Sequence, residues 1–465
     1  MFYRISDDIA LRKWKYIERA IYKKGVDHAL GITKEEFDCL FLCDGDHDLK
    51  DDEVILKLLK KGFISKCQKG EKVSSWSRFK EYDNYYFPRM NLMITGKCNL
   101  NCLHCFNAKD NEKLNTELSY QDIIGLLDQA KDIGIHAFTI TGGEPLFHPR
   151  FMDIIKEIYK RDMYVFELNT NGLLITQKML DEFKEIGCNP LMKISFDGIS
   201  YHNIIRQNEK AEELTIKAIK LCIKNGFAVK VQTQVNLNNI DTLLKTAKLL
   251  DSLGVSKMRL IRTTEAPRWE QNAPLATIPI EEYYQLMLDF AKQYIALGLD
   301  MEIDIWQFIK LYPKKKAYKI VPILCNKDEY NIRIPMCKGN RGMIAVSSSG
   351  EVVPCLQMSG YFMEKGISLA NFKEKPLKEI IAKSDYLDLA MAPLLRMLLE
   401  NKKCSNCQYF MACTGGCPAL GLLYSGKKYN FYHEDITKCY FFEHGWYDKI
   451  KEEINTYYLQ NPLNI

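Results

Sequence analysis

The stretch TGKCNLNCLHCFNA, residues 95–108, holds Cys98, Cys102 and Cys105 at the spacing C-x3-C-x2-C. Three thiols on one short loop are a ligand set for a metal ion or a metal cluster. Structural zinc prefers four ligands, and the one further donor nearby, His104, lies between two of the cysteines, where ligation would be strained. Three thiolates on a 4Fe–4S cluster leave one iron open for a small molecule. The spacing therefore favours an iron–sulfur cluster over zinc.

The composition of the whole chain agrees with metal-binding thiols. The 465 residues include 16 cysteines, and the N-terminal residues lack a secretory apolar segment. Because the cytosol keeps thiols reduced, we expect a cytoplasmic protein without a disulfide framework. No run approaches the roughly 18 apolar residues of a membrane helix. The net charge of +5 is too balanced to indicate a polyanion. We therefore expect neither a membrane nor a nucleic-acid partner.

Around the cysteine stretch, β-rich apolar runs alternate with helical patterns. Such alternation predicts an α/β fold with a parallel sheet and helices outside it, a partial (β/α)6 TIM-like barrel over residues 86–310. In this architecture the chemistry lies at the carboxyl ends of the strands. The six predicted strands are residues 91–95, 137–141, 164–169, 192–196, 228–235 and 257–261.

The flanking segments predict three further units. Residues 1–85 read as strand, two helices and strand, with a capping box at Thr33 to Glu36, which predicts a winged-helix unit. The polar residues 67–83 are interpreted as a linker. Residues 311–445 are rich in cysteine, glycine and short turns, so this domain needs metal to hold it together. Residues 446–465 are predicted to form a terminal helix.

Four motifs follow successive predicted strands, and together with the cysteine loop they resemble the radical S-adenosylmethionine (SAM) enzymes. The glycines of Thr141-Gly142-Gly143-Glu144-Pro145 allow close backbone approach. The resemblance implies that the three cysteines hold a cluster whose open iron binds SAM, and that His104 packs on the adenine. It implies that Glu144 neutralises the SAM amino group, that Ser195 hydrogen-bonds its ribose or carboxylate and that Arg206 pairs with its carboxylate. The motifs that carry the resemblance contain Gly142, Gly143 and Glu144, then Asn171, then Ser195, then Arg206.

The cysteines beyond residue 320 resemble the SPASM domain, which carries two auxiliary 4Fe–4S clusters, whereas zinc is the alternative for CxxC arms in a loop-rich domain. The resemblance implies three clusters in all. It implies that Cys404, Cys407, Cys413 and Cys439 hold the outer auxiliary cluster. By the same resemblance, Cys337, Cys355 and Cys417 would hold the inner one. Its fourth ligand is expected to be Cys325, from its position twelve residues before Cys337 and the affinity of thiolates for iron; the alternative is an iron left open for substrate. Cys39, Cys43, Cys67, Cys188 and Cys222 are interpreted as small core residues.

Relatives with SPASM domains mostly modify peptides, and residues 1–85 resemble the PqqD-like element that binds the leader of a ribosomal precursor peptide. A DNA-binding winged helix is disfavoured, because this segment holds 17 basic and 16 acidic residues. We therefore expect a peptide maturase that installs a carbon–carbon cross-link, as in streptide-type products, or a thioether, as in sactipeptide-type products. Its reductant would be a flavodoxin or ferredoxin. Arg262, Thr263, Thr264 and Glu265 are candidate peptide contacts.

Two alternatives accompany this expectation. The first is an oxidase of protein side chains similar to the anaerobic sulfatase maturases, which leaves residues 1–85 without a role. The second is a non-catalytic iron–sulfur electron carrier, which has no need of the SAM-binding motifs.

Overall fold

The computed structural model describes the chain from residue 1 to 458, except residues 16, 27, 106–114, 264–268, 270–271, 273–275, 322–330, 338–341 and 427–429. Its centre is one curved sheet of eleven strands, in the order β15-β14-β13-β12-β11-β10-β9-β8-β7-β16-β17. The neighbouring strands from β7 to β13 all pair in parallel. Those seven strands are β7 (Arg89–Thr95), β8 (Ala137–Gly142), β9 (Tyr164–Thr170), β10 (Leu191–Ser195), β11 (Val229–Val235), β12 (Lys257–Arg262) and β13 (Glu302–Ile305).

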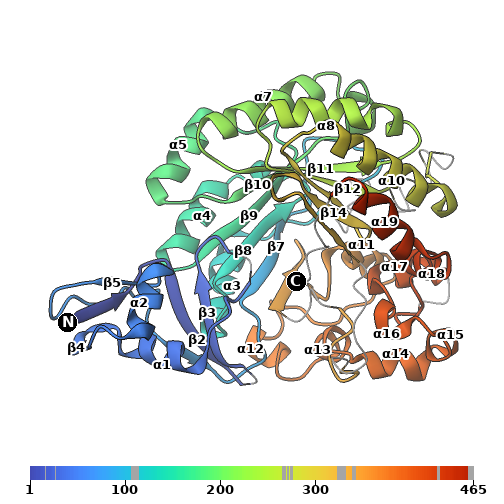
Figure 1. Ribbon diagram of the computed structural model, residues 1–465. Helices are drawn as coiled ribbons and strands as arrows, with labels where there is room; N and C mark the ends of the chain where they lie inside the picture. Colours follow the sequence, from blue (N-terminus) through green and yellow to red (C-terminus); the bar gives the residue numbers. More distant parts are fainter. Residues whose placement is uncertain are drawn as a thin grey trace.

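Helices cover the outer face of this sheet (Figure 1). Apolar residues of alternate strand positions pack with apolar helix residues in one large core; Val231 and Leu260 of the sheet and Leu250 and Met287 of the helices are fully buried in it. The predicted partial barrel is thereby confirmed, and all six predicted strands are present. The helices are α3 (Tyr120–Asp132), α4 (Phe151–Lys160), α5 (Gln177–Ile186), α7 (Ala211–Lys224), α8 (Leu243–Ser252) and α10 (Ile280–Ala296).

Strands at both ends of the barrel sheet were not predicted. On one side, β14 (Ile309–Tyr312) and β15 (Ala317–Ile320) continue the sheet in antiparallel pairing, past the boundary expected at residue 310. On the other side, β16 (Met343–Val346) pairs in parallel with β7, and β17 (Val352–Val353) pairs with β16. The C-terminal segment is thus built onto the strand that precedes the cysteine loop.

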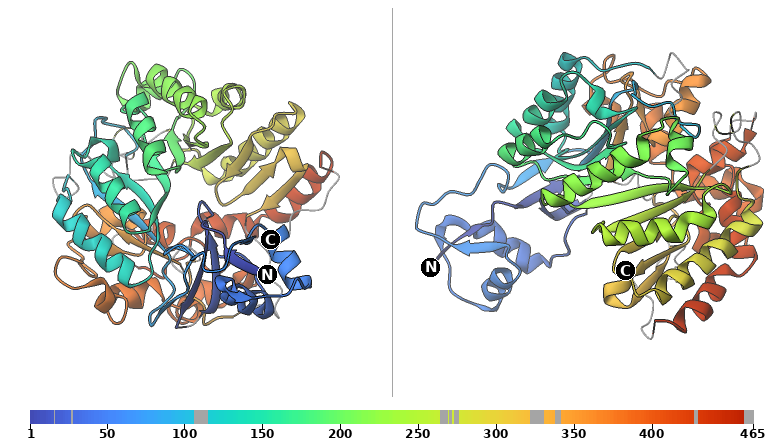
Figure 2. Two further views of the ribbon diagram at one scale, coloured as in Figure 1. Left: turned by 90° about the vertical axis from the view of Figure 1, so that its left-hand side faces the viewer. Right: turned by 90° about the horizontal axis from the view of Figure 1, so that it is seen from above.

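The N-terminal unit contains two small sheets, β4-β1-β5 and β3-β2-β6, and the two predicted helices, and it projects from one side of the barrel (Figure 2). The capping box at Thr33 and Glu36 opens α1 (Lys34–Leu42) as predicted, and α2 (Glu53–Lys60) begins after Asp52. The predicted first strand is in fact two strands. Its strands are β1 (Phe2–Ile5), β2 (Ile9–Trp14), β3 (Ile17–Lys23), β4 (Asp44–Asp48), β5 (Ile64–Lys66) and β6 (Lys80–Tyr82).

The interpretation of residues 67–83 as a simple linker is wrong in its last part, because β6 pairs in parallel with β2. This second sheet packs on the barrel: Trp14 and Trp76 share a buried cluster with Ala137 of β8 and Tyr164 of β9. Fully buried Arg12 donates to the carbonyls of Trp76 and Arg78, which fixes that segment. The N-terminal unit is therefore attached to the barrel through an aromatic interface.

The C-terminal region contains many short helices (Figure 1), three of which carry Cys404, Cys413 and Cys439. The predicted terminal helix is present as α19 (Trp446–Asn455), shorter than expected. None of the helices in the described part of the chain combines the length and the apolar character needed to cross a bilayer. The helices used below are α11 (Leu356–Glu364), α15 (Lys402–Ser405), α16 (Phe410–Cys413), α17 (Pro418–Tyr424) and α18 (Ile436–Glu443).

Candidate functional site

The first cysteine loop leaves the carboxyl end of β7, the strand between β8 and β16. Cys102 is buried, while Cys98 and Cys105 are half-buried. The loop is held by its own backbone, since Leu100 N donates to Cys98 Sγ at 3.4 Å and Cys105 N donates to Cys102 O at 3.3 Å. Burial raises the pKa of Cys98 to about 11. A bound metal would offset this by stabilising the thiolate.

Two glycines at the end of β8, Gly142 and Gly143, are in direct contact with the backbone at the start of this loop. Gly143 N donates to Thr95 O at 2.7 Å, and Glu144 N donates to Lys97 O at 2.9 Å. A Cβ on Gly142 would lie 2.6 Å from Thr95 O, and one on Gly143 would lie 2.3 Å from Gly96 O. Only glycine permits this contact. The glycine motif therefore sets the position from which the cysteine loop starts.

We expect Gly143→Ala to weaken SAM binding at least tenfold and to lower the iron content of the first site. The added Cβ would also lie 2.4 Å from Lys97 O, so the backbone before Cys98 has to move. The dissociation constant for SAM and the iron per chain measure the effect. Gly125→Ala is the matched control, because a Cβ there, within α3, meets nothing within 4 Å. Unchanged SAM binding in Gly143→Ala would show that the glycine contact does not position the loop.

Glu144 follows these glycines and is completely buried. Its Oε1 accepts hydrogen bonds from Thr170 Oγ1 at 2.8 Å and Leu146 N at 3.2 Å, and its Oε2 accepts one from Asn171 N at 2.7 Å. Burial nevertheless raises the pKa of Glu144 to about 7. A bound ammonium group would restore the ionised form, because a nearby cation favours a carboxylate. The chemistry of this group therefore fits the predicted role toward SAM, which stays a prediction.

Two further predicted residues, Asn171 and Ser195, lie at the carboxyl ends of the next two strands, β9 and β10. Asn171 Nδ2 donates to Asn99 Oδ1 at 2.7 Å and lies 4.0 Å from Cys98 Sγ, so β9 is tied to the cysteine loop. Ser195 ends β10 and is half-buried. His104 is half-buried on the loop itself. The structure thus brings the two glycines, Glu144 and Asn171 into contact with the cysteine loop, and Ser195 ends the strand next to β9.

Arg206 lies between a buried carboxylate and a cysteine of the loop, and its pairing with the SAM carboxylate stays a prediction. Its Nε and Nη2 atoms each lie 2.7 Å from Asp197 Oδ2, and its Nη1 donates to Cys102 Sγ at 3.6 Å. Burial alone would raise the pKa of Asp197, but Arg206, with His104 and His202, holds it well below its usual value. Asp197 Oδ1 accepts a further bond from Gln234 N at 3.0 Å. In this arrangement Arg206 contacts a candidate cluster ligand and is itself held by a buried carboxylate.

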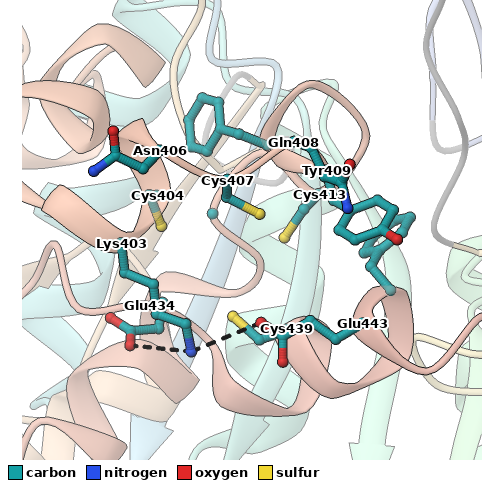
Figure 3. Close-up of a pocket in the computed structure, with 13 residues that line it drawn as sticks. Lys403, Cys404, Asn406, Cys407, Gln408, Tyr409, Cys413, Glu434, Cys439 and Glu443 are labelled. Carbon is teal, nitrogen blue, oxygen red and sulfur yellow. Dashed lines mark ion pairs between the residues drawn. The ribbon is translucent and has the colours of Figure 1, made fainter.

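Four C-terminal cysteines surround a second site. Cys404, Cys407, Cys413 and Cys439 line a cavity of about 460 Å³ between α15, α16 and α18. Their sulfur atoms turn toward a common centre (Figure 3). Burial raises the pKa of Cys404 to about 12 and that of Cys439 to about 11. Four converging thiols around a hollow are a donor set that fits an iron–sulfur cluster.

Lys403 places a cation at the rim of this cavity, between Glu434 at 3.7 Å and Glu443 at 4.0 Å (Figure 3). The charge of Lys403 acts on the thiol of Cys439, where it opposes the effect of burial on the pKa. A cation beside a thiolate ligand stabilises the more negative, reduced state of a cluster.

Cys337, Cys355 and Cys417 form the third group. Burial, with a contribution from Cys337, raises the pKa of Cys355 to about 11. Burial and Asp435, with smaller contributions from Cys355 and Cys337, raise that of Cys417 to about 12. These mutual effects place the three thiols near one another. Cys325 lies outside the described residues. Within the described ranges, no three His, Cys, Asp or Glu side chains are arranged to hold a single metal ion.

Asp435 links the second and third groups. It is fully buried; its Oδ2 accepts a bond from Cys417 N at 3.0 Å, and its Oδ1 accepts bonds from Thr437 and Lys438 at the start of the helix that carries Cys439. Sequence reasoning missed Asp435, Asp197 and Lys403. Asp435 carried a usable signal, because an aspartate directly before an apolar helical pattern is a typical N-cap.

Two of the candidate peptide contacts, Arg262 and Thr263, lie at the end of β12. Arg262 Nε donates to Ile278 O at 2.8 Å, and its Nη1 lies 3.3 Å from Tyr424 Oη of α17. Thr263 is buried at the end of β12. Thr264 and Glu265 lie outside the described residues. Of the five remaining cysteines, Cys43, Cys188 and Cys222 are buried as predicted, while Cys39 and Cys67 are half-buried.

Comparisons with known proteins give matches to the barrel and to the cysteine-rich C-terminal region. Residues 92–250 match the model of the radical SAM superfamily, and residues 337–408 match that of SPASM, an iron–sulfur cluster-binding domain. The AdoMet-dependent heme synthase of Methanosarcina barkeri is 26% identical over 350 residues, covering 74% of this chain and 94% of that protein. The PqqA peptide cyclase of Granulibacter bethesdensis is 22% identical over 274 residues, covering 58% of this chain and 68% of that protein.

The fold is similar over nearly the whole chain to that of SuiB from Streptococcus suis, solved bound to its precursor peptide SuiA. The TM-score is 0.64 at 15% sequence identity, covering 92% of this chain and 98% of that one. At this identity the likeness establishes the fold alone.

Proposed function

Because this chain carries a radical SAM domain and a SPASM domain, we propose that it is a peptide maturase that cross-links a ribosomal precursor peptide by hydrogen abstraction. The observation that carries the proposal is the meeting of the cysteine loop, the glycine contact and buried Glu144 at the carboxyl end of the parallel strands. The bond formed would be a carbon–carbon bond or a thioether. A related peptide cyclase and the fold of a protein solved with its precursor peptide support a peptide as substrate.

We propose three 4Fe–4S clusters. Cys98, Cys102 and Cys105 would hold the one that binds SAM, and His104, Asn171 and Ser195 would line the SAM site. When bound to this cluster, SAM supplies a 5′-deoxyadenosyl radical that removes hydrogen from an unactivated carbon. Glu144 would orient the SAM amino group, and Asp197 would keep Arg206 against Cys102. The auxiliary ligands would be Cys404, Cys407, Cys413 and Cys439, and Cys337, Cys355, Cys417 and Cys325. A flavodoxin or ferredoxin would deliver electrons.

The leader of the peptide would bind to the N-terminal unit, residues 1–85. A hollow of about 380 Å³ lies there beside α1 and β4, with Phe41, Phe79, Asp44 and Asp46 among its lining residues. Phe41 is 54% exposed although it is apolar, and its ring meets that of Phe79 edge to face. An aromatic pair of which Phe41 is exposed and Phe79 half-buried, next to the short edge strand β4, suits an extended segment with an apolar anchor.

We expect Phe41→Asp to weaken binding of the leader at least tenfold while SAM cleavage without peptide stays unchanged. Deleting residues 1–85 is less informative, because it would uncover Ala137 and Tyr164 of the barrel. Leu56→Asp is the matched control, since Leu56 on α2 is 56% exposed and does not line the hollow. Fluorescence anisotropy of a labelled leader measures binding. Equal affinity in Phe41→Asp and the control would place the leader elsewhere.

The test of the function itself is coexpression with a candidate precursor peptide, sought as a short reading frame beside the gene. A cross-link that forms between two carbons, or between sulfur and carbon, with net loss of two hydrogens lowers the peptide mass by about 2 Da. Tandem mass spectrometry then locates the joined residues. An unmodified peptide, together with 5′-deoxyadenosine formed in reduced enzyme, would reject the peptide substrate while leaving the radical chemistry intact.

Three alternative functions predict different outcomes of these experiments. An oxidase similar to the anaerobic sulfatase maturases would convert a single side chain and form no cross-link. An electron carrier would form no 5′-deoxyadenosine at all. The match to the heme synthase over 74% of the chain favours a small-molecule substrate instead; in that case Phe41→Asp would leave turnover unaffected.

A further inference from the structure

The inner face of the barrel sheet is polar and half-buried, in contrast to its apolar, buried outer face. In β11, Val229, Val231 and Val235 are buried against the helices, whereas Lys230, Gln232 and Gln234 alternate with them and are half-buried. Because successive side chains of a strand point to opposite faces, these polar residues face away from the helices. The same alternation places Lys193 and Ser195 of β10 on the inner face.

Three lysines lie side by side on this face. The parallel register pairs Lys193 of β10 with Lys230 of β11, and Lys230 with Lys257 of β12. Neighbouring strands are about 4.8 Å apart, so each lysine has a like charge as its lateral neighbour. Like charges directly opposite each other destabilise a sheet. In the next row toward the carboxyl ends, Arg259 of β12 lies beside Gln232.

The carboxylates around these cations are too few to neutralise them. Glu167 of β9 is shared, with Lys193 Nζ 3.3 Å from its Oε1 and Lys230 Nζ 4.0 Å from its Oε2. Asp304 of β13 is also shared, since Arg259 Nε and Lys310 Nζ both lie 3.8 Å from its Oδ2. Glu302 pairs with Lys257, at 2.9 Å. Among the residues that the structure describes, five cations therefore face three carboxylates.

Two observations indicate that this group of cations could bind a further anion. Arg259 Nε is buried and has no hydrogen-bond acceptor within the described part of the chain, because 3.8 Å to Asp304 is too long for a hydrogen bond. Lys230 is only 13% exposed in its side chain. Burial lowers its pKa to about 8; Glu167 and Asp304 act against this shift, whereas the charges of Lys193 and Arg259 add to it. A further carboxylate would relieve the repulsion and accept the free donor.

We propose that this cationic floor, formed by Lys193, Lys230, Lys257, Arg259 and Lys310, binds a carboxylate of the substrate. The inference rests on the proposed function for the location of the reacting carbon. Ser195 lies two residues beyond Lys193 on the same face, about 6.6 Å along the strand, so the floor lies one side-chain layer beneath the proposed SAM site. The substrate segment that enters the barrel would accordingly carry a glutamate or aspartate near the residue that loses hydrogen.

The test uses two small probes with the cofactor-loaded protein: N-acetyl-glutamate methylamide and its uncharged isostere, N-acetyl-glutamine methylamide. We expect the glutamate probe to bind at least tenfold more tightly, as measured by saturation-transfer NMR titration. In Lys230→Met and Arg259→Gln this ratio should fall below threefold. Lys230→Arg keeps the charge and should keep the ratio. Lys220→Met, on the exposed face of α7, is the matched control and should also keep it.

Each outcome decides the proposal. A ratio near one in the unaltered protein, or an unchanged ratio in both charge-removing variants, overturns it. A parallel titration with coproporphyrin III separates a small polycarboxylate from a peptide carboxylate. If only the porphyrin shows binding that depends on Lys230 and Arg259, the carboxylate site stands and the peptide function fails. If the glutamate probe binds as expected but coexpressed peptide stays unmodified, the failure lies with the cross-linking function and not with the floor. Melting temperature and iron content show that each variant is folded.

Discussion

Replacement of Cys98, Cys102 and Cys105 together by alanine is expected to reduce 5′-deoxyadenosine formation to the background of a protein-free assay. The three thiols lie on one loop whose start is fixed by Gly143 and whose Cys102 accepts a hydrogen bond from Arg206. Without them no iron can be held where SAM is proposed to bind, and no other cysteine of the described chain lies on that loop. The loss should therefore be complete and not graded.

The same triple variant should keep about eight irons per chain, the content of two 4Fe–4S clusters. The C-terminal thiols are positioned by separate elements, since Asp435 holds the turn at Cys417 and the start of α18. Iron analysis and electron paramagnetic resonance after anaerobic reconstitution measure this. Cys67→Ala is the control, because Cys67 is a half-buried cysteine of the N-terminal unit and should affect neither quantity. Residual SAM cleavage in the triple variant would refute the assignment of the first site.

The parts of the site that sequence analysis could predict are those encoded locally. The C-x3-C-x2-C spacing, the glycine pair and the strand–helix alternation each lie within a short window, and the structure brings the glycines and the cysteine loop into contact. Thr33 and Glu36 likewise predicted the start of α1, because a capping box involves residues only three apart.

The features that were missed depend on contacts between distant residues. β16 joins β7 across some 250 residues, and β6 pairs with β2 from within an apparent linker, so no local pattern marks either strand. The hydrogen bond of Arg206 to Cys102 spans 104 residues and could not be predicted for the same reason, whereas Asp197 lies only nine residues before Arg206. The pairing of Arg206 with the SAM carboxylate stays a prediction.

A buried carboxylate accompanies the cysteines at two of the sites. Asp197 holds Arg206 against Cys102, and Asp435 holds Cys417 and the helix that carries Cys439. Both carboxylates are fully buried and accept several hydrogen bonds. Such groups fix the ligands in place before metal arrives, which lowers the entropic cost of assembling each site.

The second large effect is expected for Asp197→Asn, which should lower the free energy of unfolding by about 3–5 kcal/mol, the usual cost of removing one partner from a buried ion pair. Arg206 is buried, and Asp197 is its one ion-pair partner among the described residues. Its guanidinium would lose that carboxylate without gaining water. Asp153→Asn is the matched control: Asp153 pairs with Arg150 on the surface, where an ion pair contributes about 1 kcal/mol or less.

The pH dependence separates this charge effect from a packing defect. The pKa of Asp197 is depressed in the folded protein, so its contribution is fully present above the unfolded value of about 3.9 and is lost as the pH falls toward the folded value. The difference between the unaltered protein and Asp197→Asn should therefore persist from pH 7 to pH 5, where only the neighbouring His104 and His202 change charge, and should shrink below pH 4. Urea unfolding of the anaerobically purified protein across this range measures it. An ion pair that stabilises the folded protein must weaken when its carboxylate is protonated. A difference below about 1 kcal/mol at pH 7, or one that does not shrink in acid, would therefore mean that the Asp197–Arg206 pair does not stabilise the structure beside Cys102.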